Sequence, residues 1–178
     1  MTLTIDYLKT ILDYNSHTGD FTWKQKLSAT GPAGSKAGCI KSTDGYVQIQ
    51  INKRKYRAHR LAWFYVHGKF PKKYIDHINH DRADNRIENL RECTDSTNQA
   101  NRRISSNNTS GYKGVFWNKI KESWEARIKK NGKSYNLGYY DNKDDAYKAY
   151  CKAAKNLFGS YAYTGLEYAT EKVADHIR

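Results

Sequence analysis

Hydrophobic and polar residues in the first half of the chain change their spacing several times. Apolar side chains three and four positions apart predict amphipathic helices, and strict alternation of apolar and polar residues predicts strands half-buried in a sheet. In chain order, these patterns predict a helix at 4–15, strands at 19–24, 45–51 and 56–58, and a helix at 59–66. Gly68 and Pro71 would end the last of these helices.

The second half begins with a polar segment, ISSNNTSG at 104–111, whose Ser, Asn and Gly content is typical of a linker. Beyond it, the spacing predicts strands at 112–118, 124–130 and 133–139, followed by a helix at 144–158. Alanines form one stripe of that helix, so it can lie close against a sheet. The prediction is an α+β fold that ends in a three-stranded antiparallel sheet packed on one helix.

The number and distribution of charged residues indicate what kind of molecule the protein binds. Among 178 residues, 31 are Lys or Arg and 18 are Asp or Glu, and 15 are tyrosines. The first 50 residues are almost balanced, with 5 basic and 4 acidic side chains. The excess lies in 51–103 and 104–178, each with 13 basic side chains. A basic surface attracts polyanions, so we expect a nucleic acid to bind the middle and the end of the chain.

The spacing of the cysteines and the first residues of the chain argue against a zinc-binding, disulfide-bonded, secreted or membrane protein. Cys39, Cys93 and Cys151 form no Cys-x-x-Cys pair, so neither a structural zinc nor a disulfide framework is expected. The first residues, MTLTIDYLKT, resemble no secretory signal, and no apolar run reaches about 18 residues. We therefore expect an intracellular, cytoplasmic protein of a bacterial or phage-infected cell, with no membrane and no obligate protein partner.

The segment 74–103 concentrates polar residues in a hairpin pattern. YIDHI at 74–78 predicts a strand, NHDRADNRIEN a solvated loop, and 90–94 the returning strand. A helix at 95–103 would follow, with Thr94 as its N-cap. The result is a ββα unit, in which Asp76 and His77 point to opposite faces of their strand. Asn98 would lie in the first turns of the helix, where it can reach back toward Asp76.

The sequence IDHINHDRADNRIENLRECTDSTNQANRR resembles the HNH endonuclease motif of phage-encoded and homing nucleases, and the preceding GYVQIQINKRKYRAHRLAWFYVHGKFP resembles the segment that leads into it. The resemblance implies a ββα-metal nuclease. By position, it makes His77 the general base, Asn89 the residue that orients its imidazole, and Asp76 and Asn98 the ligands of one divalent cation.

The chemistry of these residue types is consistent with the roles that the resemblance implies. A neutral histidine is a suitable base near pH 7, and Mg²⁺ or Mn²⁺ accepts a carboxylate, an amide oxygen and waters. Asn98 stands where many HNH proteins have histidine, which favours magnesium or manganese over softer metals. Asn85 lies four residues before Asn89 in the same loop, so either asparagine could orient the imidazole.

The segment 110–163, including YKGV, WEARI, LGYYD and the alanine-rich helix, resembles the APETALA-two (ethylene-response-factor) DNA-binding domain. In that family the sheet lies in the major groove and the helix packs behind it. Strand alternation agrees, since Glu125, Arg127 and Lys129 share the face opposite Ala126. The positions proposed to contact DNA are Arg102, Lys113, Arg127, Lys129 and Asn136.

Together, these observations predict a metal-dependent endonuclease that nicks or cleaves double-stranded DNA, like a homing endonuclease. The expected divisions are a leading region at 1–55, the nuclease motif at 56–103, a linker at 104–111, the DNA-binding domain at 112–163 and a tail at 164–178. A DNA-binding regulator without catalysis and an RNA-directed protein are the alternatives. Competition between duplex DNA and RNA for binding would distinguish the RNA-directed alternative from a DNA-binding protein.

Overall fold

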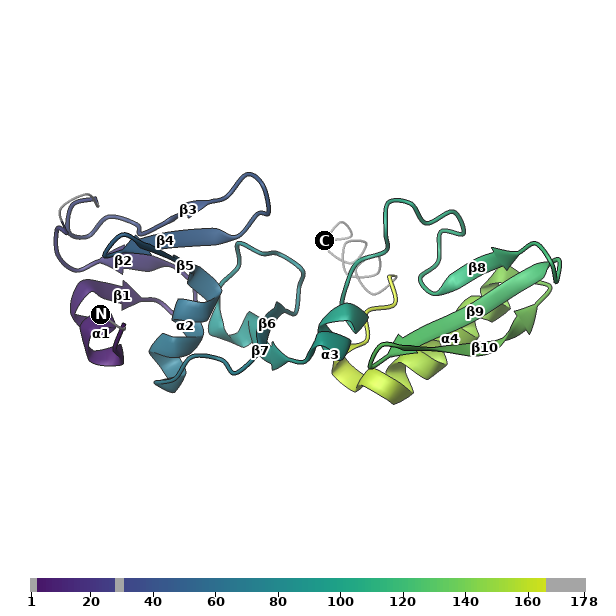
Figure 1. Cartoon of the computed structure of the whole chain (residues 1–178). Coiled ribbons are helices and arrows are strands. Elements are labelled where there is room, and N and C mark those ends of the chain that lie inside the picture. Colours follow the sequence, from purple (N-terminus) through teal and green to yellow (C-terminus); the bar gives the residue numbers. More distant parts are fainter. Residues whose placement is uncertain (1–2, 28–30, 166–178) are drawn as a thin grey trace, which may run out of the picture. The chain divides into compact units, whose positions relative to one another are not determined.

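The computed structural model describes residues 3–27 and 31–165 (Figure 1). The chain divides into two compact units, Met1–Cys93 and Thr94–Arg178. Each unit has its own hydrophobic core among the described residues. The predicted tail at 164–178 lies almost entirely outside these residues.

The N-terminal unit combines short helices with three small antiparallel sheets. Strands β1 and β2 form the first sheet, β3, β4 and β5 the second, and β6 and β7 the third. The elements are α1 (Ile5–Ile11), β1 (Leu12–Tyr14), β2 (Phe21–Trp23), β3 (Cys39–Ile40), β4 (Val47–Ile51), β5 (Arg54–Arg57), α2 (Ala58–His67), β6 (Tyr74–His77), the 3-10 turn η1 (Ile87–Asn89) and β7 (Leu90–Cys93).

Helix α1 is shorter than its spacing predicts. Thr4 caps it, because its side chain accepts a hydrogen bond from the backbone of Tyr7. The helix ends at Ile11, and Leu12 begins a strand that pairs with Trp23 of β2. Leu12 is fully buried in this strand. Its pairing with β2 therefore replaces the predicted end of the helix without exposing an apolar side chain.

The hairpin predicted between residues 74 and 94 is present as β6 and β7. The two strands pair antiparallel, with Asp76 opposite Arg91 and His77 opposite Leu90. Helix α2 was predicted at 59–66 and spans Ala58–His67, ending at Gly68 in a left-handed conformation that favours glycine.

The C-terminal unit contains one three-stranded antiparallel sheet, in the order β10, β9, β8, with helix α4 along one face (Figure 1). Its elements are α3 (Asp95–Ala100), β8 (Val115–Asn118), β9 (Ser123–Lys130), β10 (Lys133–Tyr140), α4 (Lys143–Phe158) and the 3-10 turn η2 (Gly159–Tyr161). The predicted sheet packed on one helix is therefore confirmed. Gly114, at a positive φ, leaves no room for a side chain because the Tyr150 ring of α4 lies directly against it.

Strand β10 contains a bulge. Asn136 pairs with Arg127 and Gly138 with Ala126, so Leu137 is an extra residue. The bulge reverses the alternation of β10. Tyr139 consequently lies on the exposed face, 47% exposed, while Leu137 packs against the core.

Helix α3 groups with the C-terminal unit, although the sequence assigned residues 95–103 to the nuclease motif. Ala100 is buried in the core formed with α4, and its carbonyl accepts a hydrogen bond from the backbone of Tyr163. Thr94 caps the helix as predicted. Among the described residues, no helix has the length and apolar character needed to span a membrane.

Candidate functional site

His77 lies at the end of β6 in a buried cluster of aromatic and imidazole rings. Its residue is 5% exposed, and its ring centroid is 5.0 Å from that of His59 and 5.8 Å from that of Tyr46. Burial lowers the pKa of His77 below its usual value, because removing water penalises the charged imidazolium. The imidazole is therefore neutral at neutral pH, the state that a general base requires.

His59 is a second buried imidazole, 7% exposed, in the first turn of α2. Burial, followed by the positive fields of neighbouring groups, lowers the pKa of His59 to about 3. The helix start adds to this, since the N-terminal end of a helix disfavours a cation. His59 therefore presents a neutral ring edge to His77.

Asn85 is the asparagine that lies beside His77. The polar side chain of Asn85 partly offsets the effect of burial on the pKa of His77, although the Asn85 Oδ1 accepts no well-formed hydrogen bond among the described residues. The Asn85 backbone carbonyl accepts a hydrogen bond of 2.7 Å from the hydroxyl of Tyr14. Gly19, at a positive φ, allows residues 85 and 86 to pack directly on the turn before β2, where a Cβ would collide.

Asn89, predicted to orient the imidazole, has a side chain that bonds within the loop. Its Nδ2 donates to Oδ1 of Asn79 and to the carbonyl of Asp84, and its Oδ1 accepts from the backbone of Asn79. Asp84 also forms an ion pair with Arg86. The loop predicted to be solvated is thus an internally bonded scaffold, and Asn89 supports it from within.

Asp76 is 7% exposed and faces away from His77 along the strand. Its carboxylate forms an ion pair of 2.9 Å with Arg91, the residue opposite it in the hairpin. Asn98 lies partly buried on α3, in the other unit.

The donor set suits a hard divalent cation that keeps much of its water shell. No cluster of three or more His, Cys, Asp or Glu side chains able to hold a metal ion occurs in the described part of the chain. Mg²⁺ needs only one or two carboxylates, because waters and phosphate oxygens complete its octahedron. Asp76 can supply that carboxylate, although Arg91 shares it.

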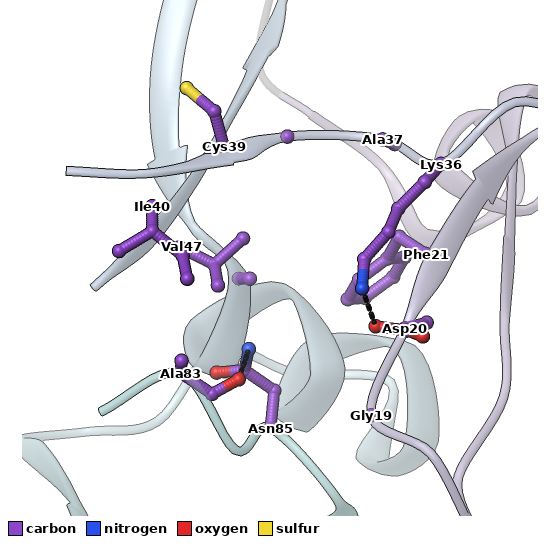
Figure 2. A pocket seen from close by; sticks show the side chains of 12 residues that line it. Gly19, Asp20, Phe21, Lys36, Ala37, Cys39, Ile40, Val47, Ala83 and Asn85 are labelled. Carbon is purple, nitrogen blue, oxygen red and sulfur yellow. Dashed lines mark hydrogen bonds and ion pairs between the residues drawn. The ribbon is translucent and has the colours of Figure 1, made fainter. Parts of the chain in front are cut away.

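Asn85 also lines a pocket of the N-terminal unit, shown in Figure 2. Val47 and Ile40 form its apolar side, and an ion pair between Lys36 and Asp20 lies across from them. The volume open to water-sized molecules is about 160 Å³.

The exposed face of the β8–β9–β10 sheet is organised around Glu125, which is only 4% exposed. Its Oε1 accepts hydrogen bonds from Nε and Nη2 of Arg127 and from Nδ2 of Asn136, and its Oε2 accepts from Asn118. Although burial opposes ionisation, these hydrogen bonds hold the pKa of Glu125 below its usual value. One carboxylate therefore links all three strands and fixes the Arg127 guanidinium.

The residues predicted to contact DNA divide into two groups. The Arg127 side chain is 49% exposed, and Lys129 and Asn136 are exposed on the same face. Lys113 is elsewhere: its ammonium donates to the carbonyls of Ala100, Arg102 and Tyr163. Burial lowers the pKa of Lys113 to about 8. Lys113 thus ties α3 to its unit, and the Arg102 side chain is exposed.

Sequence reasoning did not place Tyr46 or His59 beside His77, and it gave Glu125 no role beyond its position on the strand face. Tyr46 and His59 are far from His77 in the chain, so only folding brings their rings together. Glu125 did carry a signal, since an acidic residue preceded the basic positions Arg127 and Lys129 on the face predicted to meet DNA.

Comparison with known proteins finds a matching family in each half of the chain. Residues 56–100 match the HNH endonuclease family, and residues 110–160 match the AP2 domain. An HNH endonuclease of Acanthamoeba polyphaga mimivirus is 32% identical over 134 residues, which are 74% of this chain and 68% of the relative. Protein 3.8 of Escherichia phage T7 is 35% identical over 82 residues, which are 46% of this chain and 68% of that protein.

Proposed function

Because the chain belongs to the HNH endonuclease family, we propose that it is a metal-dependent enzyme that hydrolyses phosphodiester bonds of double-stranded DNA. The observation that carries the proposal is the buried, neutral imidazole of His77 in the β6–β7 hairpin, one residue after Asp76 in the same strand. A site of this composition offers a base and an anionic ligand within one short strand.

In this reaction the His77 imidazole accepts a proton from the attacking water as its oxygen bonds to phosphorus, and one P–O ester bond breaks. General-base help of this kind contributes roughly a hundred- to ten-thousand-fold in rate. Asn85, which lies beside His77, would help to hold the ring in orientation, and Asn89 keeps the surrounding loop in place. Burial keeps the imidazole unprotonated and ready to act.

Asp76 would hold a divalent cation, with Mg²⁺ or Mn²⁺ as the best fit, and Asn98 is the second ligand that the family pattern predicts. Such a cation stabilises the negative charge that develops on the phosphate and on the leaving oxygen. Arg91 keeps the Asp76 carboxylate in a single position on the hairpin.

The C-terminal sheet would select the target. Its exposed face carries Arg127, Lys129 and Asn136, and residues of these types read base edges and phosphates in the major groove. Because one hairpin supplies one base, a single copy would cut one strand at a time.

The test is incubation of supercoiled plasmid with magnesium and the purified protein, compared with two variants. His77→Ala should cut less than about a hundredth as fast as the wild type while it still binds DNA. His67→Ala, which alters an exposed histidine on α2, is the matched control and should cut normally. If the wild type binds plasmid but never cuts it, the protein is a DNA-binding regulator and the catalytic proposal fails.

A further inference from the structure

Two arginines that the mechanism does not use gather at one tyrosine beside His77. The guanidinium carbons of Arg57 and Arg82 each lie 5.0 Å from the centroid of the Tyr46 ring. The same ring is 5.8 Å from the imidazole of His77, centroid to centroid. Two positive charges are therefore held one aromatic ring away from the proposed base.

These residues come from separate segments of the N-terminal unit. Arg57 is the last residue of β5, Tyr46 immediately precedes β4, and Arg82 belongs to the loop between β6 and β7. Only the folded unit brings them together. The loop that carries Arg82 is the same one that positions Asn85 against His77.

Asp44 fixes both arginines. Nη1 and Nη2 of Arg57 donate to the two oxygens of its carboxylate, and Nη1 of Arg82 donates to its backbone carbonyl. The backbone N–H of Tyr46 also donates to the carboxylate. The hydrogen bonds from Arg57 lower the pKa of Asp44, so the carboxylate stays charged at neutral pH.

The charges do not cancel within this group. Two guanidinium groups and one carboxylate leave one positive charge uncompensated. Among the hydrogen bonds that the described residues make, Arg82 contributes only the one from Nη1, and a guanidinium has five N–H donors. A phosphodiester carries one negative charge, and guanidinium groups bind its oxygens in pairs. The net charge of the group matches one DNA phosphate, and the remaining N–H donors of Arg82 can bind its oxygens.

We propose that Arg57 and Arg82 form a clamp for a DNA phosphodiester group beside His77, with Asp44 as the residue that positions Arg57. The Tyr46 ring supports both guanidinium groups through cation–π contacts. The clamp rests on the proposed nuclease function, because it would hold the backbone of the strand that is cut. It adds a phosphate-binding role to residues outside the HNH catalytic pattern.

The first test compares Arg57→Ala and Arg82→Ala with Arg54→Ala, a matched control that removes an exposed arginine from the same strand as Arg57. Cleavage of a labelled duplex should show kcat/KM at least about tenfold lower in each clamp variant, and within about twofold of wild type in the control. Arg57→Lys, which keeps the charge but loses the planar fork, should also fall below wild type. An equal loss in all three alanine variants, or none in the clamp variants, would overturn the proposal.

Asp44→Asn separates positioning from general attraction. It raises the net charge by one, so simple attraction predicts faster capture and cleavage of DNA. If Asp44 positions Arg57, kcat/KM should instead fall several-fold, with an unchanged urea unfolding midpoint as evidence of a folded protein. An increase would refute the positioning role.

Binding measurements keep the clamp testable even if the protein proves not to cut. Affinity for a short duplex is measured against salt concentration in full-length His77→Ala protein. Each lost phosphate contact should reduce the slope of log K against log salt by about 0.9. Adding Arg57→Ala or Arg82→Ala should produce that change. An unchanged slope would rule out the clamp independently of catalysis.

Discussion

Replacing the buried imidazole of His59 with a phenyl ring should remove much of the acid sensitivity of the N-terminal unit. The pKa of His59 falls from 6.5 to about 3 on folding. Between these values the unfolded chain binds a proton that the folded chain excludes. The stability that His59 contributes is therefore complete above pH 6.5 and is lost as the pH falls toward 3.

The size of the effect follows from the shift. Below pH 6, the wild type should lose about 1.4 kcal/mol of unfolding free energy per pH unit through His59, or about 2.5 kcal/mol between pH 7.5 and 4.5. The titratable or charged groups around His59 include His77, Tyr46, Arg57 and Arg60. Arginine stays charged throughout, and His77 contributes with the same sign in both proteins, so the difference between wild type and His59→Phe reports His59 together with its coupling to His77.

Urea titrations at several pH values measure this difference. A shared background of Trp117→Phe and Trp124→Phe leaves both remaining tryptophans in the N-terminal unit, so fluorescence reports that unit alone. His67→Phe, at the exposed end of the same helix, is the control and should keep the wild-type pH slope. If wild type and His59→Phe lose stability in parallel from pH 7.5 to 4.5, His59 is not excluded from protonation and our reasoning about its burial is wrong.

Three further predictions concern the remaining sites. Lys113→Met should destabilise the C-terminal unit by about 1–3 kcal/mol, measured by urea unfolding, because three carbonyls lose their donor; an unchanged midpoint would contradict the structural role. Glu125→Gln should relax base preference in a binding-site selection, at a cost of roughly 1–3 kcal/mol in discrimination, because Arg127 loses its fixed orientation; retained preference would show that Glu125 does not set it. Asp76→Asn should raise the magnesium concentration needed for half-maximal cleavage, and cleavage that persists in excess chelator would exclude a metal mechanism.

Local sequence patterns predicted most of the C-terminal unit, because its strands and helix follow one another with short turns. The helix predicted at 144–158 spans Lys143–Phe158 in the structure, and the strand predicted at 124–130 spans Ser123–Lys130. The polar segment at 104–111 suggested a boundary there. Ala100 nevertheless packs in the second core, and this burial depends on contacts distant in sequence.

The site was predictable only where its residues are contiguous. Asp76 and His77 stand together in a strand, so their positions followed from the hairpin pattern. The sequence could not distinguish Asn85 from Asn89, since both are loop asparagines, and the packing of residue 85 on the turn at Gly19 depends on the tertiary fold. Tyr46 required the tertiary fold.

The single extra residue in β10 has an evolutionary consequence. Because side chains alternate along a strand, a shift of one residue exchanges the two faces of everything beyond it. Loss of Leu137 would restore regular pairing with β9, and gain of another residue nearby would shift the phase again. Insertions and deletions at this point could therefore exchange which side chains meet a target such as DNA, while β8, β9 and α4 stay unchanged. A lineage of such proteins could acquire new target sites through changes in length as well as through substitutions.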